Sequence, residues 1–190
     1  HKSTKRFLYI TPYLNEVSRI CDSCDFDQPD SNHMSKSADL KLRLRMGRNV
    51  AATHSLFYLM DKEAVQLIQQ KGYSLIIDES IQVVERLNVT QKDFEVDDNG
   101  MVHWKDPEYD GRFSDYKDMA NTGSLLQRDS ALLNILNPDL LRAFDEVFML
   151  TYLFEGQYQK AYLEFFGFPY KVVGVKHDSN GFYFSDEPDE

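Results

Sequence analysis

Short apolar runs alternate with amphipathic segments along most of this chain. The apolar runs lie at residues 5–11, 49–53, 73–78, 146–151 and 170–175. Runs of this length predict strands that are buried on both faces, as in a parallel sheet. Apolar residues at helical spacing occupy residues 15–21, 61–71 and 157–166. The alternation predicts an α/β fold with a mainly parallel sheet and helices on both faces.

Capping residues define several of the predicted helices. Asp61 is placed to cap the helix that Gly72 ends, and residues 35–39 can cap a short helix over 40–46. Residues 21–39 are polar and predict a loop. Further short helices are predicted over 81–87, 124–134 and 138–144.

A single domain over residues 1–176 is predicted, with an insertion at about residues 90–120. The insertion is acidic and contains Asn99-Gly100, which is typical of a hairpin or an irregular segment. Its aromatic residues could stack on bases or form a small core, and we favour the core. These residues are Trp104, Tyr109, Phe113 and Tyr116. Residues 177–190 predict an acidic linker or tail.

The charge is negative overall but uneven along the chain. The 190 residues carry a net charge of −10, while the first 60 alone carry +3. The total argues against a protein that coats nucleic acid without specificity, although a basic front half could still present one phosphate-binding face. An unevenly charged, solvated surface explains the pattern equally well.

Neither a leader peptide nor a membrane-spanning run is present in this sequence, so we expect a cytoplasmic protein that makes no membrane contact. The chain begins at His1 inside a charged segment, so we expect either a truncated reading frame or a chain that was trimmed at this end. Cys21 and Cys24 form one isolated C-x-x-C pair. Without a second pair they are expected to be plain thiols and not zinc ligands.

Candidate chemistry is concentrated where the run at 73–78 ends. Asp78 and Glu79 follow directly on the buried strand. In open α/β sheets ligands bind beyond the carboxyl ends of strands, where Asp78 can hold Mg²⁺, often through water, and Glu79 can activate a water molecule. A strand that simply ends in solvated acids remains the alternative.

Four such strand ends, in order, carry a family resemblance. They are Phe7-Leu8-Tyr9-Ile10-Thr11-Pro12, Asn49-Val50-Ala51-Ala52-Thr53-His54, Leu75-Ile76-Ile77-Asp78-Glu79 and Val147-Phe148-Met149-Leu150-Thr151. This series resembles motifs Ia, Ib/Ic, II (Walker B) and III of the first RecA-like domain of superfamily-one and -two helicases. It is most similar to the DEAD/DEAH-type ATPases of bacteriophages and prophages.

The resemblance implies ATP and Mg²⁺ as cofactors and nucleic acid as partner, with DNA favoured over RNA. Asp78 would position Mg²⁺, Glu79 would activate water, and Thr151 would couple the nucleotide site to the nucleic acid. The residues on the path of the nucleic acid would contact its backbone phosphates, which carry no sequence information. They are Thr11, Pro12, Thr53 and His54. Thr53 and His54 could instead form a strand-end cap with a partly buried imidazole.

The departures from the family pattern define the alternatives. No G-x-x-x-x-G-K-[ST] loop occurs in this sequence, and we expect no second RecA-like domain within its 190 residues. Ser80-Ile81 after the carboxylates leaves the subfamily open. We therefore expect a partial motor domain that hydrolyses ATP poorly as it stands. The alternatives are an inactive acidic binding protein of RecA-like descent and, with less support, a nuclease that would need further acids or a lysine.

Overall fold

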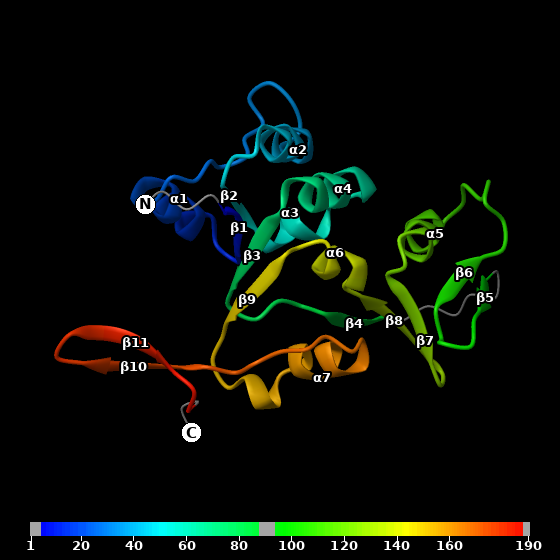
Figure 1. Ribbon diagram of the computed structural model, residues 1–190. Coiled ribbons are helices and arrows are strands. Elements are labelled where there is room, and N and C mark those ends of the chain that lie inside the picture. The colour runs from blue at the N-terminus through cyan, green and yellow to red at the C-terminus, as the bar shows by residue number, and fades with distance from the viewer. Residues whose placement is uncertain (1–4, 88–93, 188–190) are drawn as a thin grey trace.

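A four-stranded parallel sheet forms the centre of the computed structural model, which describes residues 5–87 and 94–187. The strand order is β2-β1-β3-β9 (Figure 1). The bounds are β1 Arg6–Thr11, β2 Val50–Thr53, β3 Tyr73–Asp78 and β9 Glu146–Leu150. Strands are thus confirmed in four of the predicted ranges, and the fold is mixed α/β with a parallel central sheet. Residues 88–93, where the predicted insertion begins, and 188–190, where the predicted tail ends, lie outside the described part.

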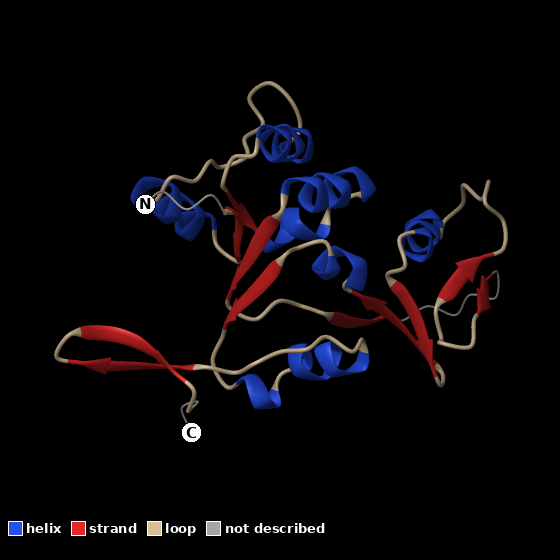
Figure 2. Cartoon of the chain, viewed as in Figure 1, coloured by secondary structure: helices blue, strands red, loops and turns tan. Residues whose placement is uncertain are grey.

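Helices cover the two faces of this sheet unequally. α1 (Leu14–Ser23) packs on β1 and β2 from one side, through Val17 against Tyr9 and Ala51. Several helices pack on the other face (Figure 2). They are α2 (Lys36–Met46), α3 (His54–Tyr58), α4 (Lys62–Lys71) and α6 (Pro138–Arg142).

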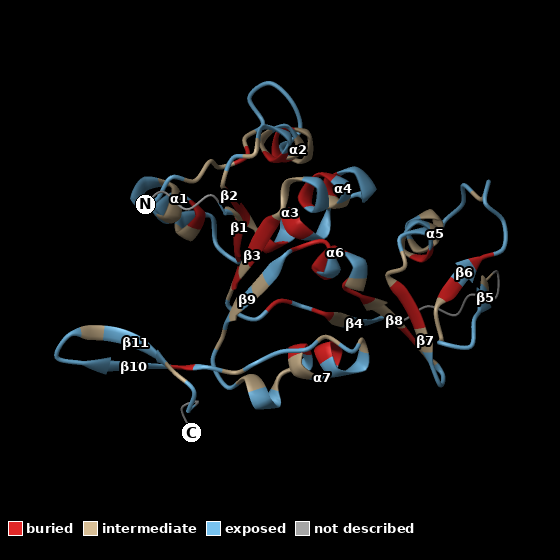
Figure 3. Ribbon diagram, in the orientation of Figure 1, coloured by how far each residue is buried: buried red, intermediate tan, exposed pale blue. Residues whose placement is uncertain are grey.

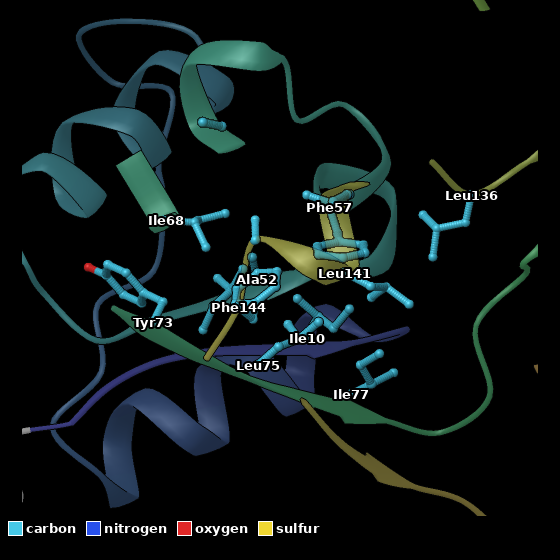
Figure 4. Close-up of a cluster of buried hydrophobic side chains, with 14 of the residues drawn as sticks. Ile10, Ala52, Phe57, Ile68, Tyr73, Leu75, Ile77, Leu136, Leu141 and Phe144 are labelled. Carbon is cyan, nitrogen blue, oxygen red and sulfur yellow. The ribbon is translucent and has the colours of Figure 1, made fainter. Parts of the chain in front are cut away.

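The main hydrophobic core lies between the sheet and this second group of helices. Ile10, Leu75 and Ile77 project from β1 and β3 toward Phe57 and Phe144 (Figure 4). All five residues are at most 8 % exposed. The buried colour in Figure 3 accordingly follows the central strands. Alternate residues of each strand face this core, so the register of the sheet is fixed by burial.

Helix boundaries follow the capping chemistry that the sequence predicts. The Ser35 hydroxyl accepts from the amide of Ala38, and the Asp61 carboxylate accepts from that of Ala64. Gly47 and Gly72 end α2 and α4 in the left-handed conformation. The predicted caps at Asp61 and Gly72, and the one expected within residues 35–39, are confirmed.

A second, smaller core lies beside the main one. Trp104 and Leu125 are buried in it, with Tyr109, Phe113 and Tyr116 packed around them. The prediction that these aromatics form a small core is confirmed. The elements that build it are β4 (Val84–Leu87), β5 (Phe94–Val96), β6 (Val102–Trp104), α5 (Ser114–Asn121), β7 (Leu125–Arg128) and β8 (Ala131–Ile135).

Two predicted helices in this region are wrong. Residues 84–87 form β4, and residues 125–135 form the β7–β8 hairpin, which pairs in an antiparallel sheet of order β4-β8-β7. Asp129 adopts φ 51°, the left-handed conformation that a two-residue hairpin loop requires. Pairing and burial of the leucines across the hairpin outweigh their helical spacing.

The C-terminal part adds a short 3₁₀ helix, a helix and a hairpin. They are η1 (Phe154–Gly156), α7 (Tyr158–Phe165), and β10 (Gly174–Asp178) with β11 (Gly181–Ser185). The strand predicted over 170–175 is wrong in position, because Asp178-Ser-Asn-Gly181 sets the turn and the pairing begins at Gly174. The hairpin projects from the molecule near the C-terminus (Figure 1).

Within residues 5–87 and 94–187, none of the helices combines the length and the apolar character needed to cross a bilayer.

Tyr73 offers a direct test of how the main core is held. Its ring is fully buried, and its hydroxyl donates to the carbonyl of Arg48 at 2.6 Å. Tyr73→Phe leaves that carbonyl without its donor, so we expect the free energy of unfolding to fall by about 1–2 kcal/mol in urea denaturation. Tyr183→Phe removes a hydroxyl from the exposed hairpin and serves as the matched control. Equal stability of the two variants would contradict this account.

Candidate active site at the carboxyl edge of the sheet

The predicted site residues all lie at one edge of the parallel sheet. Thr11, Thr53 and Asp78 are the last residues of β1, β2 and β3. Pro12, His54, Glu79 and Thr151 each directly follow one of the four strands. The register pairs Thr11 with Thr53 and Asp78 with Leu150, so the ends are level across the sheet.

Asp78 is held from two sides, by Tyr9 of β1 and by His54 at the start of α3. The Tyr9 hydroxyl donates to Asp78 Oδ2 at 2.7 Å. Burial, followed by this hydrogen bond to the carboxylate, raises the pKa of Tyr9, which therefore stays a donor. His54 Nε2 lies 3.0 Å from the backbone carbonyl of Asp78. The carboxylate is thus oriented by β1, and its backbone is fixed by α3.

Glu79 is held in position by its backbone. Its φ of 66° is left-handed, a conformation that costs a residue with a Cβ about 1 kcal/mol. The Glu79 amide donates to the carbonyl of Leu150 at 2.9 Å, which ties the turn to β9. The residue is exposed, so the turn presents a carboxylate to solvent beside Asp78.

Burial makes His54 a neutral group in the folded protein. The imidazole is 9 % exposed, and burial lowers its pKa from the ordinary value of 6.5, although the Asp78 carbonyl acts in the opposite direction. Thr53 accepts from the amide of Leu56 at 3.3 Å and so caps α3. The interpretation of this pair as a strand-end cap with a buried imidazole is confirmed.

Thr11 carries an unsatisfied hydroxyl at the same edge. The residue is fully buried, and its Oγ1 finds no hydrogen-bond partner among the described residues. Such groups are rare and call for an explanation. Pro12, the next residue, is exposed and ends the strand.

Two glutamines that sequence reasoning missed join the ends of β3 and β9. Gln157 Nε2 donates to Thr151 Oγ1 at 2.7 Å, and Gln159 Nε2 donates to Gln157 Oε1 at 2.8 Å. Gln159 Oε1 in turn accepts from the amide of Ile81 at 3.3 Å. Gln159 is 1 % exposed, and its spacing from Tyr162 and Leu163 was the available signal that it faces the core.

Several cations of the basic front half are paired with acids. On α2, Arg43 bonds Asp39 at 2.8 Å, and Lys41 contacts both Asp61 and Glu63. Arg48 likewise pairs with Asp27. Acids on α2 and α4 and in the loops before them therefore pair with these cations. These pairs favour an unevenly charged, solvated surface over one open phosphate-binding face.

A magnesium ion at this edge would need ligands beyond the side chains. Among residues 5–87 and 94–187, no cluster of three or more His, Cys, Asp or Glu residues is arranged to hold a metal. The single half-exposed carboxylate of Asp78 fits a Mg²⁺ ion whose other ligands are waters and phosphate oxygens.

Comparison with known proteins relates the chain to a prophage protein. Residues 67–134 match the family model of the YonV middle domain. This range includes Asp78, Glu79 and most of the smaller core. The SPbeta prophage-derived uncharacterized protein YonV of Bacillus subtilis (strain 168) is 31% identical over 202 residues, covering 94% of this chain and 49% of that protein. The chain therefore spans about half the length of this relative. No solved structure matches the chain.

The buried imidazole gives the stability of the protein a pH dependence. The unfolded imidazole takes up a proton near pH 6.5 and the folded one only at lower pH. The unfolded state thus binds more protons in this window, and the free energy of unfolding should fall as pH drops from 7 to 5. His54→Gln removes this contribution, so urea denaturation should show a shallower slope over that window. Identical slopes for the two proteins would contradict neutral burial of His54.

Proposed function

We propose that this chain is part of the first RecA-like motor domain of a nucleic-acid helicase or translocase that uses ATP. One observation carries the proposal. Asp78 ends an interior strand of a parallel sheet and Glu79 follows it directly. The polar residues at the ends of the three other strands lie level with them, in the predicted motif order. Ligands of open α/β sheets bind at this edge. The prophage origin of the similar Bacillus protein agrees with the phage-type resemblance.

In this proposal the two carboxylates have different roles. Asp78, oriented by the Tyr9 hydroxyl, would hold Mg²⁺ through water. Glu79, exposed at the turn, would accept a proton from the attacking water. The residues of this chain fit the magnesium side of such a site. The loop that would hold the triphosphate is not among them, so hydrolysis by this chain alone would be slow.

The remaining strand ends would connect the nucleotide to the nucleic acid. Thr11, Pro12, Thr53 and His54 would line the path of the nucleic-acid backbone. Pro12 is exposed and Thr53 is half-buried there, while Thr11 and His54 are buried beneath them. The unpartnered hydroxyl of Thr11 is fully buried, so it could donate to the nucleic acid only if this edge of the sheet opened. Thr151 is linked through Gln157 and Gln159 to Ile81, just after the carboxylates, so a shift at one loop would be transmitted to the other.

A second candidate is an inactive acidic binding protein with the same ancestry. Two observations favour it. The basic residues on α2 are already paired with neighbouring acids, and the chain as a whole carries a net charge of −10. Such a surface would bind a basic protein partner.

Glu79→Gln distinguishes these two functions. We would measure Mg·ATP binding by calorimetry and ATP hydrolysis by phosphate release. Both measurements would be made on this chain and on a form extended upstream by roughly 40 residues, enough for one strand, loop and helix. In the extended form, the variant should bind ATP like the unmodified protein and hydrolyse it about 100-fold more slowly. Glu85→Gln, on exposed β4, is the matched control. If neither form binds nucleotide, the motor proposal fails and the acidic binding protein is the better account.

A further inference from the structure

A hollow lies between the smaller core and the end of α7, separate from the carboxyl edge of the sheet. Its volume is about 630 Å³, and it is open to solvent. Its walls come from the loop before β6, the end of β7, α6 and the end of α7. The residues that carry chemistry there are Asp98, Asn99, Arg128, Asp139, Arg142 and Phe165.

Two guanidinium groups face this hollow, and among the described residues only one of them is paired with a carboxylate. Arg142 is tied down, because it pairs with Asp139 at 3.1 Å and donates to the carbonyl of Phe166 at 3.2 Å. Arg128 is exposed and has no carboxylate within ion-pair distance among the described residues. Arg128 therefore supplies the positive charge that is available to a ligand.

An aromatic surface lies directly beside that charge. The Phe165 ring is 53 % exposed, and the Arg128 guanidinium lies over it, 5.9 Å from its centroid. A base would therefore pack on the part of the ring that the guanidinium leaves uncovered. A large exposed ring with a neighbouring unpaired arginine is the combination on which nucleic-acid bases stack while a phosphate is bound. The side-chain amide of Asn99 has no hydrogen bond within the described residues, and Asp98 is a second acceptor. Amides and carboxylates of this kind bind the edges of bases.

We propose that this hollow binds one nucleotide unit, with the base against Phe165 and the phosphate on Arg128. The unit can belong to a free nucleotide or to a single strand, since both offer the same base and phosphate. The site uses neither Asp78 nor Glu79 and is independent of the proposed ATPase. It would give the smaller core a binding function of its own.

Fluorescence anisotropy with a labelled single-stranded 15-mer of mixed sequence tests the site, in EDTA so that no Mg²⁺-dependent chemistry contributes. Arg128→Gln and Phe165→Leu should each weaken binding by about tenfold, the loss typical of one stacked base. Phe165→Tyr keeps the ring and should bind like the unmodified protein. Arg112→Gln removes a guanidinium that lies over another ring, Phe113, and should change binding less than about twofold.

Competition with AMP separates the two sources of the nucleotide unit. Displacement of the oligonucleotide by AMP, lost in Arg128→Gln, would support a free nucleotide as ligand, and binding of the oligonucleotide alone would support a strand. The proposal is overturned if the unmodified protein binds neither probe. It is equally overturned if Arg128→Gln and Arg112→Gln weaken binding alike.

Discussion

Parallel pairing of β1 with β3 is the constraint on which the rest of the molecule depends. These two strands are the interior pair of the sheet, and each also pairs with an outer strand, β2 or β9. Because all four run in the same direction, every strand must end at the same edge. The helices that connect them are thereby forced onto the faces, and the polar residues after each strand are brought level. The chemistry of the edge is a direct result of this pairing.

The polar groups at that edge are stabilised in unequal ways. Asp78 has a hydroxyl partner on β1, and His54 is kept neutral by burial. Thr11 is buried without a partner within the described residues. An edge that combines satisfied and unsatisfied groups differs from an ordinary core, where nearly all buried polar atoms are paired.

The sequence contained enough information for the sheet but not for the region beside it. The runs ending at Thr11 and Asp78 are continuous and apolar, and no helix competes with them. The leucines of residues 125–135 satisfy a helix and a hairpin equally well, and only pairing with β4 decides between them. At the site, the position of Asp78 followed from the strand that precedes it. The partnership with Tyr9 did not, since a tyrosine within an apolar run gives no sign of which side chain it will reach.

The left-handed backbone at Glu79 has a consequence for how this protein can evolve. Glycine or asparagine would relieve the strain at that turn and raise the stability of the fold. Random substitution would therefore drift toward those residues unless the carboxylate itself were retained by selection. Retention of a glutamate in this conformation is the outcome that selection for its carboxylate would produce. Descendants with glycine at this position would be more stable and would lack the carboxylate together with its role.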